Sequence, residues 1–212
     1  ISILEVQKEI TKFGEIASRM SGFTQTLISS TDMKERRSMI KKIEEYEGIT
    51  DRIEIELTEY LTKISREDIT PRTSIRIRSI MNICNDLERI GDVFYQMSKT
   101  VEKKTEDKVW FTPHQRTRME EMFVLIDKAF KIMVTNLGSE HYDKVTKTEA
   151  VDIENQIDAQ RNLMREENTK MVASSPEDYN IRSAMVYNTL FSSLEKVGDH
   201  IINVNEAIVG EI

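Results

Sequence analysis

Hydrophobic residues recur every three or four positions along most of the chain, with charged and polar residues between them. Side chains at this spacing lie on one face of an α-helix, so each stripe predicts an amphipathic helix that packs against others. The strict alternation of a half-buried strand is not evident. The clearest stripe consists of Ile77, Ile80, Cys84, Leu87, Phe94, Met97 and Val101. The pattern therefore predicts an all-α protein.

Capping signals divide the stripes into separate helices. Each proline follows a hydroxyl residue, in Thr70-Pro71, Thr112-Pro113 and Ser175-Pro176. This order is typical of an N-cap followed by the first helical residue, where the missing N–H of proline costs nothing. Asp32, with Glu35 three positions later, has the spacing of a capping box and predicts a fourth helix start.

The sequence Gly138-Ser139 indicates the end of one helix and the start of another. Six long helices are predicted, at residues 2–29, 33–66, 71–104, 113–137, 142–173 and 176–209. Because the links between them are short, neighbouring helices should be antiparallel, and together they should form an elongated bundle.

Two short motifs recur at a fixed distance along the chain. LERIGD at residues 87–92 and LEKVGD at 194–199 are 107 positions apart, and so are EGITD at 47–51 and ENQID at 154–158. One acidic pair at positions i and i+4 means little, but two pairs repeated in register are hard to obtain by chance. We therefore predict two tandem antiparallel three-helix repeats, at residues 1–107 and 108–212.

The repeated motifs place acidic residues at matching heights on neighbouring helices. Residues i and i+4 share a helix face. The middle of EGITD lies about 20 residues before the turn near Asp68, and the middle of ERIGD about 21 residues after it, so an antiparallel hairpin brings them level. In the second half the mismatch is about four residues, or ~6 Å, which a stagger of the helices can absorb. The predicted metal ligands are Glu47, Asp51, Glu88 and Asp92 in one hairpin, and Glu154, Asp158, Glu195 and Asp199 in the other.

Such a gathering of carboxylates is unfavourable without a cation. Like charges destabilise a helix and raise one another's pKa, and Gly91 and Gly198 each cost roughly 1 kcal/mol relative to alanine. Bound cations would remove the repulsion, and the glycines would let a helix or a metal cluster approach closely. Oxygen ligands suit Mg²⁺, Ca²⁺, Mn²⁺ or iron. The alternative is a solvated acidic face balanced by neighbours such as Arg89 and Lys196.

Composition excludes several other functions. The net charge of −7 argues against nucleic-acid binding. The single cysteine, Cys84, cannot form an internal disulfide and is predicted to be a buried, inert thiol. No membrane span is visible. Because the chain starts at Ile1 rather than at methionine, we expect it to be a fragment or processed product, with any membrane-spanning part outside the sequence.

Catalytic chemistry is not indicated either. Ferritin-like di-iron sites need Glu-x-x-His, but glycine stands three positions after Glu88 and Glu195. His200 is only a weak candidate ligand, because it points ~100° away from Asp199 around the helix. No phosphate-binding loop, nucleophile elbow or Cys–His pair is present, so we expect no enzyme.

Two features remain open: the basic residues 34–42 and Arg72, Arg76 and Arg78 could be solvated faces or could contact an anionic partner. Trp110 and Phe111, between the halves, are predicted to pack the two bundles together.

Two three-helix repeats with the hexapeptides LERIGD and LEKVGD resemble the PhoU family over nearly the whole chain. The resemblance implies a six-helix bundle of two repeats, with a multinuclear iron or zinc cluster on each set of carboxylates, and a regulatory role in phosphate uptake. The opening ILEVQKEITKFGEIASRM is similar to the first helix of the PhoU domain fused to bacterial sodium/phosphate cotransporters. One departure is that Glu54 of the first repeat corresponds to Arg161, so the two metal sites could differ.

The leading expectation is therefore a cytoplasmic regulatory domain of a sodium/phosphate cotransporter, tethered to the inner membrane through a transporter domain in the same chain. Phosphate is a further candidate ligand, and self-association is open. One alternative is a stand-alone PhoU-type regulator of an ABC transporter and a sensor kinase. Another is a structural array of three-helix repeats such as spectrin, although the break at VWFTP, residues 109–113, does not fit helices that run on from repeat to repeat.

Overall fold

The computed structural model describes residues 3–174 and 180–210, and over these residues it contains helices and no strand. This confirms the predicted all-α class. The helices are α1 (Ile3–Ser29), α2 (Met33–Ser65), α3 (Pro71–Glu106), α4 (Pro113–Leu137), the short 3₁₀-helix η1 (Tyr142–Lys144), α5 (Thr148–Ser174) and α6 (Ile181–Val209). None of them is long and apolar enough to cross a membrane.

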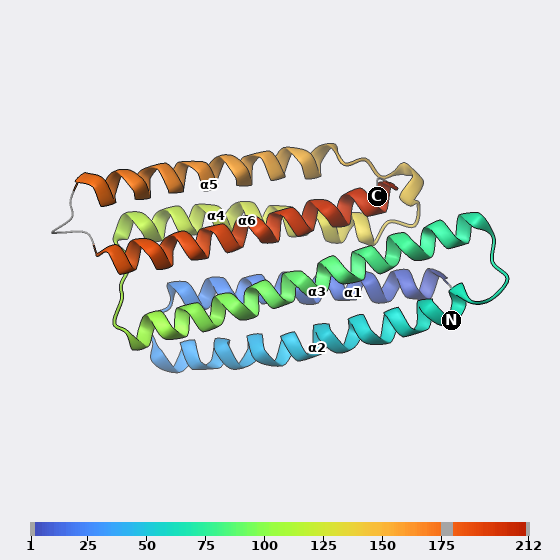
Figure 1. The fold of residues 1–212 in the computed structure, drawn as a ribbon, viewed down its shortest axis with the longest axis horizontal. Helices are drawn as coiled ribbons and strands as arrows, with labels where there is room; N and C mark the ends of the chain where they lie inside the picture. The colour runs from blue at the N-terminus through green and yellow to red at the C-terminus, as the bar shows by residue number, and fades with distance from the viewer. Residues whose placement is uncertain (1–2, 175–179, 211–212) are drawn as a thin grey trace.

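The helices run side by side as an elongated bundle (Figure 1). Helices α1, α3, α4 and α6 contact one another at the centre, while α2 packs on α1 and α3, and α5 packs on α4 and α6. Corresponding helices of the two halves meet in pairs, α1 with α4 and α3 with α6. The halves therefore lie against each other along their length. A spectrin-like array, in which repeats follow one another end to end, would not give this arrangement.

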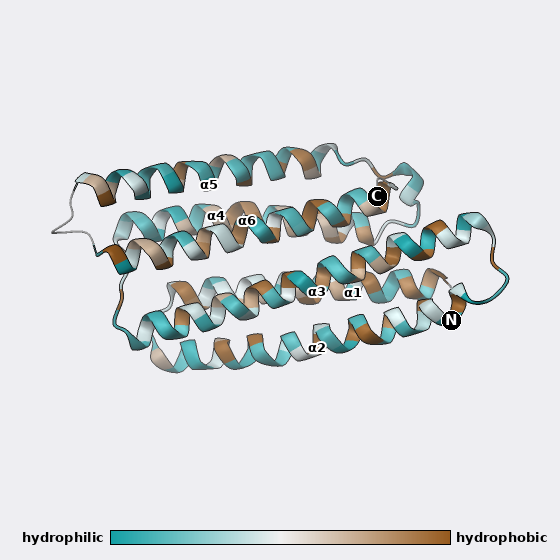
Figure 2. Cartoon of the chain, viewed as in Figure 1, coloured by the Kyte–Doolittle hydropathy of each residue, from teal (hydrophilic) through white to brown (hydrophobic). Residues whose placement is uncertain are grey.

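One hydrophobic core runs through both halves. The inner faces of the helices carry the apolar residues and the outer faces the polar ones (Figure 2). Phe94 of α3 and Phe130 of α4 are fully buried, and their ring centroids lie 6.1 Å apart across the boundary between the halves. Burial of one such side chain stabilises a fold by roughly 1.5–3 kcal/mol, so contacts of this kind hold the halves together.

Three predicted helix starts are confirmed by their capping hydrogen bonds. The Thr70 hydroxyl accepts from the Thr73 N–H at 3.2 Å, and the Thr112 hydroxyl accepts from Gln115 N–H at 3.2 Å. Asp32 also caps α2, accepting from the Lys34 N–H at 2.9 Å. Glu35 does not complete a capping box there, because its carboxylate accepts a hydrogen bond from the Ser30 hydroxyl instead.

Two predicted starts in the second half are wrong. The fifth helix begins at Thr148 rather than at residue 142, and Ser139 does not begin a helix. Tyr142 is buried and its hydroxyl donates to the Leu137 carbonyl at 2.8 Å, which holds residues 142–144 as one 3₁₀ turn against the end of α4. The sixth helix begins at Ile181, where Asn180 is the N-cap. The predicted cap Ser175-Pro176 lies outside the described residues.

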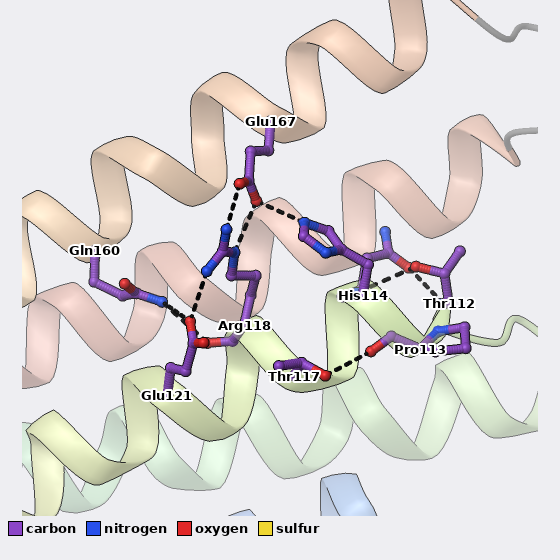
Figure 3. Close-up of polar contacts among 9 residues, drawn as sticks. Thr112, Pro113, His114, Thr117, Arg118, Glu121, Gln160 and Glu167 are labelled. Atoms are coloured by element: carbon purple, nitrogen blue, oxygen red, sulfur yellow. Dashed lines mark hydrogen bonds and ion pairs between the residues drawn. The ribbon is translucent and has the colours of Figure 1, made fainter.

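Helix α5 is anchored to α4 by a polar network (Figure 3). The Arg118 guanidinium donates to both oxygens of Glu167, at 3.0 and 2.6 Å, and to Glu121 at 3.0 Å. His114 adds a 2.8 Å hydrogen bond to Glu167, whose pKa is lowered to about 2, mainly by Arg118. Because α5 buries few side chains, this network supplements a small apolar contact.

The link between the halves is only partly as predicted. Phe111 is buried and its ring packs edge-on against Tyr187 of α6, with centroids 5.7 Å apart. Trp110 is 57% exposed and does not enter the core, so the prediction that it packs the bundles together is wrong. Cys84 is fully buried as predicted, and burial raises the pKa of its thiol to about 12.

Candidate metal centre

The four acidic residues of the first hairpin are divided between α2 and α3, and no three of their carboxylates come within 4.8 Å of one another. Glu47 and Asp51 are on α2, and Glu88 and Asp92 are on α3. Burial, followed by repulsion from Asp51 and Asp92, raises the pKa of Glu47. Burial, followed by repulsion from Asp92, Asp51 and Glu54, raises the pKa of Glu88. The two helices thus bring their carboxylates within electrostatic reach of one another, as the helix register predicts.

A close approach of α2 to α3 makes this possible. A Cβ atom added to Gly91 would lie 2.8 Å from the Thr50 hydroxyl oxygen, so only glycine leaves room for Thr50 at its present distance. Thr50 is buried and donates a 2.8 Å hydrogen bond to the Glu47 carbonyl. Gly91 therefore lets α2 rest against α3 between the two acidic pairs.

The second hairpin forms a tighter cluster. Ligand oxygens of Glu154 and Asp158 on α5 and of Asp199 on α6 all lie within 4.8 Å of one another. Burial and then repulsion from Asp158 raise the pKa of both Glu154 and Asp199. Within the described ranges this is the one group of three or more His, Cys, Asp or Glu side chains gathered so closely. The predicted stagger of the second hairpin does not keep its carboxylates apart.

The glycine of the second motif occupies the equivalent place. A Cβ atom at Gly198 would lie 3.3 Å from the Cγ2 atom of Ile157. Ile157 is 107 positions after Thr50, as Gly198 is after Gly91. The two hairpins thus repeat the same contact between a glycine and the outer helix, and the predicted role of the glycines in close helix approach is confirmed.

The clusters differ in charge at the position of Glu54 and Arg161. In the second cluster an Arg161 nitrogen lies 3.8 Å from the carboxylate of Glu195, and both side chains are largely buried. Burial and Asp199 raise the pKa of Glu195, while Arg161 lowers it. In the first cluster the corresponding residue is Glu54, which adds to the repulsion on Glu88. At this position the second cluster therefore carries a counter-charge and the first a further acid, although Arg89 lowers the pKa of Glu88 in the first cluster.

The donor set fits a cation that binds oxygen. In the second cluster the Oδ1 atom of Asp158 is buried and accepts no hydrogen bond from the described residues. A buried carboxylate oxygen without a donor is costly, and a metal ion at that point would satisfy it. Glu154, Asp158 and Asp199 would be its first ligands, with Glu195 available if it leaves Arg161. The first cluster would offer Glu47, Asp51, Glu88 and Asp92.

His200 is not placed as a ligand. Its Nδ1 atom lies 2.9 Å from the carboxylate of Asp86 on α3, and Asn203 donates to the same carboxylate at 3.4 Å. Asp86 has no signal in the sequence, because this contact joins the two halves and has no counterpart at the 107-residue offset. The pair ties α6 to α3 next to the two clusters. Of the three arginines left open, Arg76 stacks on the Tyr142 ring at 4.4 Å, which gives it a structural role.

Comparisons with known proteins agree with this architecture. The family model described as PhoU domain matches twice, at residues 10–101 and 119–208. Among solved structures, PhoU from Pseudomonas aeruginosa superposes with a TM-score of 0.82 at 17% identity, covering 97% of this chain and 94% of that one. The phosphate transport system regulatory protein PhoU from Streptococcus pneumoniae gives a TM-score of 0.76 at 17% identity, covering 97% and 92%. At this identity the structures establish the fold alone. No curated protein matches the sequence.

Proposed function

Because the chain belongs to the PhoU family, we propose that it regulates phosphate uptake and that its two carboxylate clusters bind metal ions. The observation that carries the metal part is the register of the clusters. The acidic side chains on α2 and α3 lie within electrostatic reach of one another, three of those on α5 and α6 come within 4.8 Å, and in each hairpin a glycine lies at the contact between the helices. A regulatory role rather than catalysis follows from the family.

The bound ions would change the surface of the bundle. Without them each cluster is a patch of mutually repelling carboxylates, whereas with them it becomes neutral or cationic and offers open coordination positions. Iron or zinc follows from the family resemblance, while the all-oxygen ligands also suit Mg²⁺, Mn²⁺ or Ca²⁺. The loaded face is the part of the molecule that we propose docks on a partner.

We propose that the partner is a phosphate transport system at the cytoplasmic face of the membrane. The solved relatives support a stand-alone regulator, because this chain covers 94% and 92% of them and one is titled a phosphate transport system regulatory protein. That version would link an ABC transporter to a sensor kinase. The similarity of residues 3–20 to cotransporter-linked PhoU domains supports the second version, a domain of a sodium/phosphate cotransporter. The division into repeats at residues 1–107 and 108–212 remains part of this proposal.

Metal analysis of the purified protein tests the metal part. Protein prepared without chelator should contain bound metal, and Glu88→Gln with Asp92→Asn should lose the share held by the first cluster. Glu195→Gln with Asp199→Asn should lose the share of the second. The matched control, Glu102→Gln with Glu106→Gln, removes an i, i+4 pair from the same helix α3 outside the clusters. Equal metal content in the cluster variants and the control would exclude these ligands.

The regulatory part is tested in cells that depend on this chain. Loss of the chain should leave phosphate uptake unrestrained in phosphate-rich medium, and the wild-type gene should restore control. Unchanged phosphate uptake after its loss would contradict the proposed function, whatever the metal content of the protein.

A further inference from the structure

A cationic cavity lies at the end of the bundle where α1 and α3 end and where α2 and α4 begin, on the left in Figure 1. Its volume is about 360 Å³. Three cationic side chains line it, Arg36 of α2, Lys104 of α3 and Arg116 of α4, together with the exposed ring of Trp110. This group lies outside the carboxylate clusters and has no part in the metal proposal.

Lys104 is the least satisfied of the three cations. It is only 7% exposed, and its ammonium faces two rings, 5.3 Å from the Trp110 centroid and 4.4 Å from that of Phe111. Among the described residues its ammonium makes no hydrogen bond or ion pair, although its backbone carbonyl accepts from the Val109 N–H. Burial, then Arg36 and Arg116, lower its pKa to about 8. Ring contacts compensate an ammonium only in part, so the site favours an arriving anion.

The two arginines add positive charge without a carboxylate partner. Arg36 is 8% exposed, its Nε atom donates to the Ser30 carbonyl at 2.6 Å, and its guanidinium lies 5.7 Å from the Trp110 centroid. Arg116 donates from Nε to the Phe111 carbonyl at 3.2 Å. Both stand in the first turn of a helix, where the helix dipole already disfavours a cation. No ion pair within the described ranges involves any of the three cations.

A purely structural role explains part of this arrangement. The hydrogen bonds from Arg36 and Arg116 to carbonyl groups fix the end of α1 and the link between α3 and α4. The ammonium of Lys104 is stabilised by the helix dipole, because it lies in the last turn of α3. These contacts do not explain why three cations converge. The repeat of the two halves does not explain the position of Arg36 either, because the equivalent position in the second half, 107 residues later, is Asp143.

We propose that this cavity binds a phosphate group, held by Arg36, Lys104 and Arg116 with Trp110 covering one side. Two guanidiniums and an ammonium match the charge and the hydrogen-bonding needs of a phosphate oxyanion. The hydroxyl residues Ser29 and Thr31 also line the cavity. The choice of phosphate among oxyanions rests on the proposed function, whereas the anion site itself rests on the geometry. The phosphate could be free or part of a small phosphate monoester.

Trp110 provides a direct measurement, because it is the only tryptophan in the chain. Its fluorescence is titrated with inorganic phosphate, glycerol phosphate and sulfate at constant ionic strength. The wild type should respond saturably to at least one phosphate compound. Lys104→Met keeps the length of the side chain and removes the charge, and it should weaken binding at least tenfold. Lys103→Met makes the same charge change on an exposed neighbour and should bind like the wild type.

A loss of phosphate binding in Lys104→Met can be distinguished from unfolding of the variant. Removing an uncompensated buried charge should leave Lys104→Met at least as resistant to urea as the wild type, and Lys104→Arg should retain binding. A response to inorganic phosphate identifies the free ion as the ligand, and a response to glycerol phosphate alone identifies an ester. The proposal is overturned if neither compound binds, if Lys104→Met binds as well as Lys103→Met, or if sulfate binds as tightly as phosphate.

The metal proposal is tested separately in the same preparations. Glu88→Gln with Asp92→Asn should leave the phosphate titration unchanged, and Lys104→Met should leave the metal content unchanged. Phosphate binding without any bound metal, or the reverse, therefore shows which of the two proposals has failed. If phosphate uptake is unchanged in cells that lack the chain, the proposed regulatory role is contradicted, but the proposed phosphate-binding site is not.

Discussion

At the scale of single residues, some carboxylates of the clusters are less stable when ionised than ordinary exposed ones, namely Glu47, Glu88, Glu154, Glu195 and Asp199. Burial, then Asp92 and Asp51, raise the pKa of Glu88 above its usual 4.5. A carboxyl group whose pKa is raised by folding lowers the stability of the protein as the pH rises from its unfolded pKa through its folded pKa. In the metal-free protein, Glu88 therefore opposes folding at pH 7 and has no such effect below about pH 4.

We predict that Glu88→Gln stabilises the metal-free protein at pH 7 by about 0.5–1 kcal/mol, because it removes repulsion from three neighbouring acids. Urea unfolding in the presence of chelator measures this difference, which should disappear near pH 3.5. Adding the bound metal should reverse the sign, since the variant has lost a ligand. Glu102→Gln, on the same helix outside the cluster, should show neither change. A variant that is destabilised in chelator at pH 7 would show that the repulsion is already compensated by the protein.

At the scale of helices, the sequence predicts what depends on local chemistry. The starts of α3 and α4 follow from Thr70-Pro71 and Thr112-Pro113, because an N-cap needs only its own neighbours. The start of α5 does not, since the Tyr142 hydroxyl donates a hydrogen bond to the Leu137 carbonyl at the end of α4 and holds residues 142–144 outside the helix. Likewise, helix period predicts that Glu88 meets Asp51, but not that His200 meets Asp86, 114 residues away.

Helix packing at the first cluster gives a second prediction. Gly91→Ala should destabilise the protein by about 1–2 kcal/mol, although alanine favours a helix by roughly 1 kcal/mol. The new Cβ would lie 2.8 Å from the hydroxyl of Thr50, a β-branched side chain that is 1% exposed and has no room to move. The matched variant is Gly48→Ala, on α2, where nothing lies within 4 Å, and it should stabilise the protein by about 0.5–1 kcal/mol.

Chemical denaturation of the metal-free proteins compares the two variants. Gly198→Ala should fall between them, because the nearest atom of Ile157 would be 3.3 Å away and belongs to a longer side chain. If Gly91→Ala proved as stable as Gly48→Ala, α2 could shift away from α3 at no cost, and the close approach would not fix the position of the carboxylates.

At the scale of the whole molecule, two equivalent hairpins share one core but carry different charges. Corresponding helices pack against each other, and the contact between Gly91 and Thr50 in the first hairpin is repeated by the contact between Gly198 and Ile157 in the second. The sequence offset shows this equivalence and also shows the exchange of Glu54 for Arg161. It does not show the consequence, which needs the structure: Arg161 reaches Glu195, and Glu54 repels Glu88.

This difference predicts that the first cluster binds cations more tightly than the second. A positive charge beside the ligands opposes a metal ion, and a negative one assists it, so the affinities should differ by at least about tenfold even after solvent screening. Each cluster can be measured alone by titrating metal into protein whose other cluster has been neutralised by substituting the Glu and Asp of LERIGD or LEKVGD with Gln and Asn.

Exchanging the two residues should exchange the affinities. Arg161→Glu frees Glu195 as a ligand and supplies a fifth acid, so binding at the second cluster should rise, whereas Glu54→Arg should weaken the first cluster by a similar factor. The effect should shrink as salt is added, as expected for charges that are partly exposed. An exchange of charge without an exchange of affinity would mean that the closer gathering of carboxylates in the second cluster, and not charge, sets the difference between the two sites.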